Sequence, residues 1–383
     1  MERQMFLLEE NGTVVTNGRL VEGLTYEIEK EGMRKKVKLI KEGKVIAFLK
    51  SSSILGGSDF YSDYADVATR KICQKVGIKC ANNLLVAIEG MPKTPQEIEL
   101  DREEDIRSEE FIEKLPEALR ENARKHRESQ KALKSKLKGV ISYNYMETDK
   151  YKHCQRMSLD EIRSQQLMLG GDAVSPSVNG YMQLINNLQG ESTLAKNLGL
   201  VGTIDIDPNF KYDLLGLSML SFTTAQTDLT GLNIDIVFRK TPQGVRAEVG
   251  PIFDGGESLG LSSIARSPEW DERDYDDKCS DILNGINNLS PSRLTIKSET
   301  SQDDTMAQAQ ELAAAVYHDP IAKEMFERFK AIDIEDIIDG IDVGEPDFDV
   351  VRFALRESFG TRVQMIENCM SALKSPMDNA YMQ

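Results

Sequence analysis

The spacing of apolar residues changes along this chain, from a strand-like pattern in the first fifty residues to a helix-like pattern after residue 158. Residues 36–40 and 45–49 are apolar segments joined by Lys41-Glu42-Gly43-Lys44, which predicts an antiparallel hairpin. A β-rich first part followed by an α-rich second part predicts an α+β fold. The segments with helical spacing include 66–77, 214–220, 305–317, 321–329 and 350–373.

The length of 383 residues exceeds the usual size of one compact core, so we expect two lobes. We assign residues 1–146 to an N-terminal lobe and residues 147–383 to a mainly helical C-terminal lobe. Within segment 91–137, residues 97–136 are dominated by Glu, Asp, Arg and Lys, with few apolar positions. This composition predicts a solvated helical insertion within the first lobe.

The overall composition argues against several classes of function. A net charge of −16 disfavours direct binding to nucleic acid, because an acidic surface repels phosphate backbones. Five cysteines without a Cys-x-x-Cys pair and three separated histidines do not predict a disulfide framework or a zinc site. No apolar run approaches the roughly 20 residues that span a bilayer. The N-terminus has no signal-peptide pattern, so we expect a cytoplasmic protein, with secretion lacking a cleaved signal left open.

The segment Gln226–Phe238 carries the most chemical information. It contains an apolar helix end, a polar loop with Asp228 and Asn233 five positions apart, and then a strand. Phosphoryl transfer from ATP needs a carboxylate near the acceptor hydroxyl and oxygen ligands for magnesium. An Asp and an Asn at this spacing can supply both.

A second carboxylate follows a predicted hairpin. The strand pattern at 234–238, a turn at 241–244 and a second strand lead to Phe253-Asp254-Gly255-Gly256. Such a hairpin returns Asp254 toward the first loop, where it can bridge magnesium to nucleotide phosphates. Asp-Gly is also a common turn pair, so either motif alone is weak evidence.

These motifs resemble those of the HipA-like kinases within the protein-kinase-like superfamily. That family has a loop of Asp, four residues and Asn, followed by a hairpin and a Phe-Asp-x-Gly element, and the preceding Gly250-Pro251-Ile252 is also similar. The resemblance implies a bilobal kinase fold, with Asp228 as the catalytic base and with Asn233 and Asp254 as magnesium ligands. The family's usual loop His is absent here, where Leu229-Thr230 follow the Asp.

The first lobe contains further parts that resemble this family. The segment Gly32–Lys36 is similar to its phosphate-binding loop, which implies a phosphate contact for Lys36. Lys50 ends a predicted strand where the family has its ATP-binding lysine. Asp66, at the start of the next predicted helix, stands where a related carboxylate holds that lysine.

The segment 138–145 resembles the family's strand that leads into the hinge between lobes. Backbone groups around Tyr143 and Tyr145 are therefore expected to contact the adenine edge. A simple core strand is the alternative interpretation.

Together these features predict an ATP- and magnesium-dependent protein kinase that phosphorylates Ser or Thr of a protein, including itself. Ser51, Ser52, Ser53 and Ser58, in a predicted loop, are candidate autophosphorylation sites. Two alternatives stay open: a nucleotide-binding pseudokinase that acts through protein interactions, and a small-molecule or lipid kinase on the same fold.

Overall fold

The computed structural model describes residues 3–9, 11–29, 34–54, 57–58, 62–91, 95–134, 136–190, 192–226, 228–253, 258–259, 274–288, 294–297, 304–344 and 348–374. The chain forms two compact units. The β-rich unit comprises Arg3–Leu55 and Leu85–Ile141, and the helical unit comprises mainly Gly56–Leu84 and Ser142–Gln383. This distribution confirms the predicted α+β fold class, while the lobe boundary at residue 146 stays a prediction.

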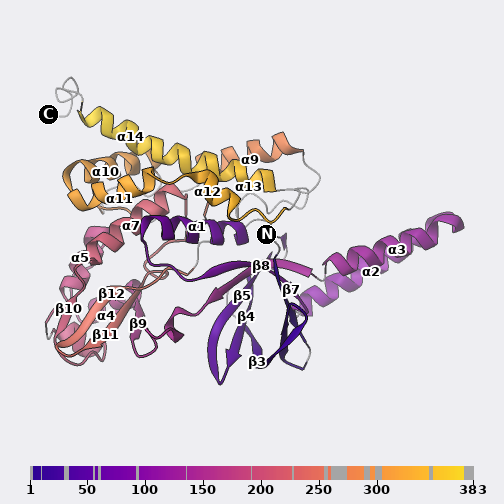
Figure 1. Cartoon of the computed structure of the whole chain (residues 1–383), viewed down its shortest axis with the longest axis horizontal. Coiled ribbons are helices and arrows are strands. Elements are labelled where there is room, and N and C mark those ends of the chain that lie inside the picture. Colours follow the sequence, from indigo (N-terminus) through magenta and orange to yellow (C-terminus); the bar gives the residue numbers. More distant parts are fainter. Residues whose placement is uncertain are drawn as a thin grey trace. The chain divides into compact units, whose positions relative to one another are not determined.

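The β-rich unit is built on one antiparallel-rich sheet that closes on itself (Figure 1). Its strands follow the order β4-β3-β2-β1-β7-β8-β5, and an additional pairing joins β4 to β5. That pairing is the predicted hairpin, and it places Val37 opposite Leu49 and Leu39 opposite Ala47, all buried. The strands are β1 (Gln4–Leu8), β2 (Thr13–Thr16), β3 (Arg19–Glu29), β4 (Arg34–Lys41), β5 (Lys44–Ile54), β7 (Asn83–Glu89) and β8 (Lys136–Tyr143).

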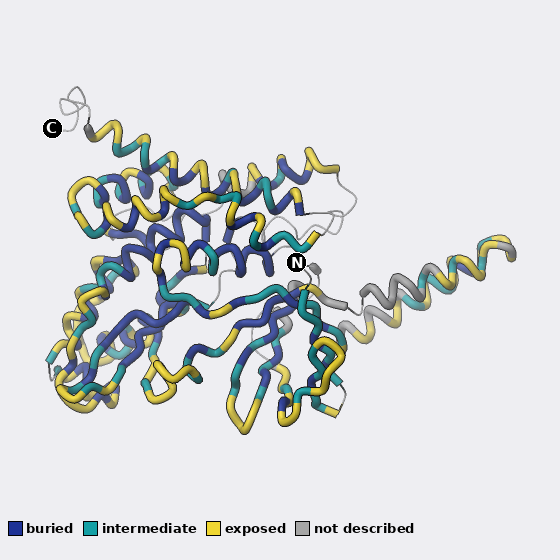
Figure 2. Tube along the Cα trace, viewed as in Figure 1, coloured by how far each residue is buried: buried dark blue, intermediate teal, exposed yellow. Residues whose placement is uncertain are grey.

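The predicted charged insertion is a helical hairpin of α2 (Pro95–Lys114) and α3 (Glu117–Lys134), which extends from the sheet of its unit (Figure 1). Ion pairs join the two helices, including Arg124 to Glu109 at 2.8 Å and Arg127 to Asp105 at 3.1 Å. Most of the residues of this hairpin whose burial the structure describes are exposed (Figure 2), as its charge pattern predicted.

The helical unit is organised around α7, which is buried on nearly every side (Figure 2). A helix that is apolar all round is stable only inside a core. Helices from the C-terminal part of the chain pack around it, with α10 against α14 and α11 against α7 (Figure 1). The helices are α1 (Ser62–Val76), α4 (Leu159–Met168), α5 (Val178–Asn186), α6 (Thr193–Asn197), α7 (Phe210–Thr223), α9 (Tyr275–Asn288), α10 (Thr305–His318), α11 (Pro320–Lys330), α12 (Ile334–Asp339), α13 (Phe348–Leu355) and α14 (Thr361–Lys374).

A second sheet, in the order β10-β12-β11-β9, lies within the helical unit. Its central strands form the predicted second hairpin, with Ile236 opposite Val249 and Phe238 opposite Ala247. The same buried face carries these four apolar residues, which explains why the hairpin has this register. The strands are β9 (Gln155–Ser158), β10 (Ile204–Ile206), β11 (Asp235–Thr241) and β12 (Gly244–Val249), and the short strand β6 (Gly57–Ser58) and the 3₁₀ turn η1 (Tyr145–Glu147) complete the unit.

Several predicted boundaries were wrong. β5 continues to Ile54, so Lys50 lies inside the strand and Ser51–Ser53 are not part of a loop. α1 begins at Ser62, so Asp66 lies in its second turn and not at its start. The predicted helix 350–373 is interrupted by the π-helical turn η3 (Arg356–Gly360). No helix among the described residues is long and apolar enough to cross a bilayer.

Candidate active site

The loop that carries Asp228 and Asn233 connects the C-terminus of α7 to β11. Ala225 adopts a left-handed conformation (φ 50°), which turns the chain out of α7. The turn is held from both sides, since the Gln226 amide donates to Ser221 O (2.8 Å) and the Ser221 hydroxyl donates to Gln226 O (2.9 Å). The chain therefore enters the Asp228 loop in a fixed direction.

Asp228 and Asn233 are joined directly. The Asn233 side-chain amide Nδ2 donates to the Asp228 backbone carbonyl at 2.7 Å, and the Thr230 amide donates to the same oxygen at 2.9 Å. The Asn233 backbone amide in turn donates to the Thr230 carbonyl at 2.9 Å. These bonds close a compact loop in which the Asn233 side chain has a defined orientation.

The loop is docked on α4 and α5. Leu229 is buried, and the first amides of α4 donate to the loop, Asp160 N to Gly231 O (3.2 Å) and Leu159 N to Ile234 O (3.0 Å). At Gly231 an added Cβ would lie 2.3 Å from the Tyr181 hydroxyl and 2.5 Å from Asp160 Oδ1. Only glycine fits this close approach. Burial raises the pKa of the Tyr181 phenol, so it stays protonated beside Asp160.

The start of β11 is tied to η1 through Tyr145. The Tyr145 hydroxyl donates to Asp235 Oδ2 at 2.5 Å, and Arg156 lies 3.4 Å from the same oxygen. Burial raises the pKa of both the Tyr145 phenol and the Asp235 carboxyl. The Tyr145 side chain is thus committed to the core, and its carbonyl accepts from the Thr148 amide (3.1 Å) and hydroxyl (2.6 Å), so its contact with adenine stays a prediction. Tyr143, by contrast, is exposed.

The strand that leads to Asp254 is well anchored up to Phe253. The Gly250 amide donates to Asp235 O at 2.8 Å, next to the Asp228 loop in sequence. Ile252 then pairs with the segment after α1, through Ile252 N to Lys79 O (3.1 Å) and Ala81 N to Ile252 O (2.7 Å). Phe253 packs against Tyr145, Tyr151 and Val237. Asp254 itself lies outside the described residues, so its role as a metal ligand stays a prediction.

The predicted phosphate-binding lysines are brought together in the β-rich unit. Lys36 on β4 is the direct cross-strand partner of Lys50 on β5. Lys50 is buried and Lys36 is half-buried. Residues directly opposite one another on neighbouring strands point to the same face of a sheet, so both side chains can reach one bound anion. Their phosphate contacts stay a prediction. Asp66 is buried on α1 in the other unit, and its predicted pairing with Lys50 stays a prediction.

The donor set of the loop fits a magnesium ion chemically. Magnesium prefers amide, carboxylate and phosphate oxygens. Asn233 uses its side-chain nitrogen Nδ2 to hold the Asp228 carbonyl, so its side-chain oxygen Oδ1 faces the other way. No donor among the described residues binds Asn233 Oδ1. No cluster of metal-binding side chains occurs within the described part of the chain. Asn233 and Asp254 therefore remain the predicted ligands, with the ATP phosphates completing the shell.

Four stabilising residues around the site were not predicted from the sequence. Lys79 Nζ lies 2.8 Å from Asp213 on α7, 3.5 Å from Glu248, and 3.1 Å from Val249 O on β12. Asp235 and Gly231 anchor the loop as described above. Arg362 Nη1 donates to Phe222 O at 3.1 Å at the end of α7, and burial lowers the pKa of Arg362 to about 10. Their partners are remote in sequence, so no local signal identified them.

No protein-family model matches the sequence, and no curated protein matches it. The fold is similar to the proinflammatory kinase CtkA of Helicobacter pylori, at 12% identity and a TM-score of 0.52, covering 91% of this chain and 98% of that chain. At this identity the similarity shows the fold alone. The chain therefore has a protein-kinase-like fold, which confirms the fold implied by the resemblance.

Two further solved structures are similar at lower scores. One is HipA in a complex with HipB and operator DNA from Shewanella oneidensis (12% identity, TM-score 0.40, 90% of this chain and 64% of that chain). The other is the Golgi casein kinase (11% identity, TM-score 0.34, 91% of this chain and 73% of that chain).

Proposed function

We propose that this protein is an ATP- and magnesium-dependent kinase that transfers the γ-phosphoryl group to a Ser or Thr hydroxyl of a protein, including its own chain. The observation that carries the proposal is the Asp228 loop. In this loop the exposed Asp228 is joined to Asn233. The side-chain nitrogen of Asn233 donates to the loop backbone, whereas its side-chain oxygen binds no donor among the described residues. The kinase-like fold supports the same conclusion.

Each residue has a proposed task. Asp228 accepts the proton of the acceptor hydroxyl or orients that hydroxyl. Lys36 and Lys50 bind phosphate oxygens, and Asn233 and Asp254 hold magnesium. When bound, the ion neutralises charge on the transferring phosphoryl group. The buried anchors Leu229 and Asp235 keep the loop in place, so that binding energy is not spent on ordering it.

A phosphotransfer assay with γ-³²P-labelled ATP tests this proposal. The wild-type protein should label itself or a generic Ser/Thr protein substrate in the presence of magnesium. Asp228→Asn should lose at least about 100-fold of the rate while its circular dichroism spectrum is unchanged. Thr230→Ser is a matched control in the same loop that should retain activity. Undiminished labelling by the Asp228→Asn variant would refute the assigned role.

A nucleotide-binding pseudokinase is the second candidate. It is favoured by the loop after Asp228, where Thr230 occupies the position of the His that the resemblance implies, and by the charged insertion at 91–137. Magnesium-dependent thermal stabilisation by ATP, without any phosphorylated product, would favour this candidate over the enzyme.

A further inference from the structure

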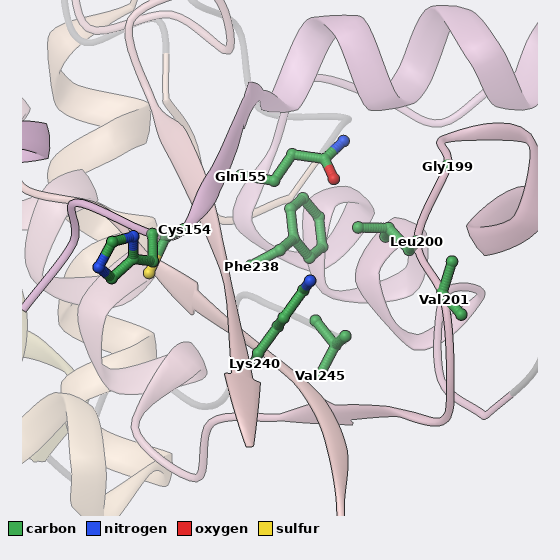
Figure 3. A pocket seen from close by; sticks show the side chains of 9 residues that line it. Cys154, Gln155, Gly199, Leu200, Val201, Phe238, Lys240 and Val245 are labelled. Carbon is green, nitrogen blue, oxygen red and sulfur yellow. The ribbon is translucent and has the colours of Figure 1, made fainter. Parts of the chain in front are cut away.

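A pocket of about 360 Å³ lies in the helical unit, at the end of β11 that is remote from Asn233 (Figure 3). This volume falls in the range of small-molecule sites. Its walls come from β9, β11, β12 and the loop after α6. Lys240 is five residues beyond Asp235 on β11, or about 16 Å along the strand. The pocket is therefore separate from the Asp228 loop.

One wall of the pocket is apolar. Phe238, Leu200 and Val245 line it, and all three are buried. Figure 3 shows the Phe238 ring and the Leu200 side chain directed toward one another across the pocket. Val201 lies at the rim and is 86% exposed. A flat apolar group would be covered on both sides by such walls.

The polar side of the pocket is cationic. The exposed Lys240 lies two residues beyond Phe238 on β11, so its side chain leaves the same face of the strand, and Figure 3 shows it among the residues that line the pocket. The neighbouring cations of this sheet are paired, Arg239 with Glu248 and Arg246 with Asp205, but Lys240 has no carboxylate partner among the described residues. The Val201 backbone amide also has no acceptor within the described part of the chain.

Two more polar residues complete the lining. Gln155 is held in place because its Nε2 donates to Leu198 O at 3.0 Å. His153 also lines the pocket. No acidic side chain is among the described residues that line it. On a chain with a net charge of −16, a pocket without acids and with an unpaired lysine selects for a negative ligand.

We propose that this pocket binds a small organic anion, with a flat apolar body against Phe238 and Leu200 and with a carboxylate or phosphate group on the Lys240 ammonium. A charge-assisted hydrogen bond to Lys240 orients the anionic group, and the apolar walls supply contact area. The proposal does not depend on kinase activity.

Isothermal titration with three probes of the same body tests the chemistry: 2-naphthoate, 2-naphthyl phosphate and the neutral 2-naphthylmethanol. At least one anion should bind about tenfold more tightly than the alcohol, because a hydrogen bond between charged groups adds to the apolar contact. The tighter of the two anions identifies the preferred anionic group. Equal affinities for all three probes would overturn the proposal. Displacement of the anions by ATP would also overturn it, because they would then occupy the nucleotide site.

Variants at the rim locate the site without disturbing the core. Val201→Asp should weaken binding of the anions and Val201→Lys should strengthen it, because the first adds a negative charge and the second a positive charge at an exposed position of the pocket lining. Lys240→Met should weaken anion binding about tenfold and leave the alcohol unchanged. Lys323→Met, at an exposed lysine of α11, is the matched control and should have no effect. Anion affinities unchanged by both Val201 variants and by Lys240→Met would place the ligand elsewhere.

Discussion

Replacing Lys79 by methionine should destabilise the helical unit strongly. Lys79 lies 2.8 Å from Asp213, whose side chain is only 8% exposed, and 3.5 Å from Glu248, which is 3% exposed. Met keeps most of the apolar stem and removes the ammonium group. Asp213 then loses the cation that offsets its burial, and Val249 O loses a donor. Removing one partner of a buried ion pair costs about 3–5 kcal/mol.

The loss in free energy of unfolding can be predicted more closely from the exposed fraction of the Lys79 side chain. The Lys79 side chain is 26% exposed, so solvent lowers the cost toward about 3 kcal/mol. Glu248 contributes little to the loss, because Arg239 at 3.3 Å and Lys150 at 3.6 Å still pair with it. Urea unfolding followed by circular dichroism at 222 nm measures the free energy directly.

Lys211→Met is the matched control. Lys211 also connects α7 to another element through one carboxylate, Asp319 at 2.5 Å, but its side chain is 44% exposed. Its removal should cost only about 0–1 kcal/mol. In the double variant Lys79→Met/Asp213→Leu, the uncompensated carboxylate is gone, so most of the stability should return. Equal losses for Lys79→Met and Lys211→Met, or no recovery in the double variant, would refute this reasoning.

Three further predictions concern the site and its surroundings. Gly231→Ala should lower phosphotransfer at least about tenfold, because the new Cβ would lie 2.3 Å from the Tyr181 hydroxyl; Gly360→Ala, where an added methyl group would have no atom within 4 Å, is the control. Lys36→Met should raise the KM for ATP in the phosphotransfer assay, because it removes one of two cations that face each other across β4 and β5, and an unchanged KM would contradict the proposed phosphate contact. The Arg356 hydrogen bond to Glu335 holds the pKa of that carboxyl below its ordinary value. The ion pair therefore contributes to stability above about pH 4.5, and this contribution is lost as the pH falls through the lowered pKa. The difference in urea midpoint between wild type and Glu335→Gln should shrink on acidification, and a constant difference would contradict this.

Much of the fold follows from local sequence signals. The β4–β5 hairpin is predicted by a turn between two apolar segments, and the structure confirms it. Ser158 and Glu161, three positions apart, form a capping box at the start of α4, which is a motif of purely local sequence. The Asp228–Asn233 spacing also reflects a local loop, and these two residues are indeed hydrogen-bonded. Signals of this kind involve residues that are close in sequence, so they can be recognised without knowledge of the fold.

The supporting groups of the site could not be predicted in the same way. Lys79 and Asp213 are 134 positions apart, and Tyr145 and Asp235 are 90 positions apart. Nothing near Lys79 in sequence distinguishes it from an exposed lysine. The extension of β5 past Lys50 was missed because Ser51–Ser53 are weak strand formers, and pairing in the sheet overrides that preference.

A crystal structure with a non-hydrolysable ATP analogue and magnesium would test the central claim most directly. The account predicts Asn233 Oδ1 and the Asp254 carboxylate as magnesium ligands at about 2.0–2.1 Å, with the Asp228 carboxylate near the γ-phosphate. A bound nucleotide whose magnesium takes no ligand from Asn233 or Asp254 would contradict it.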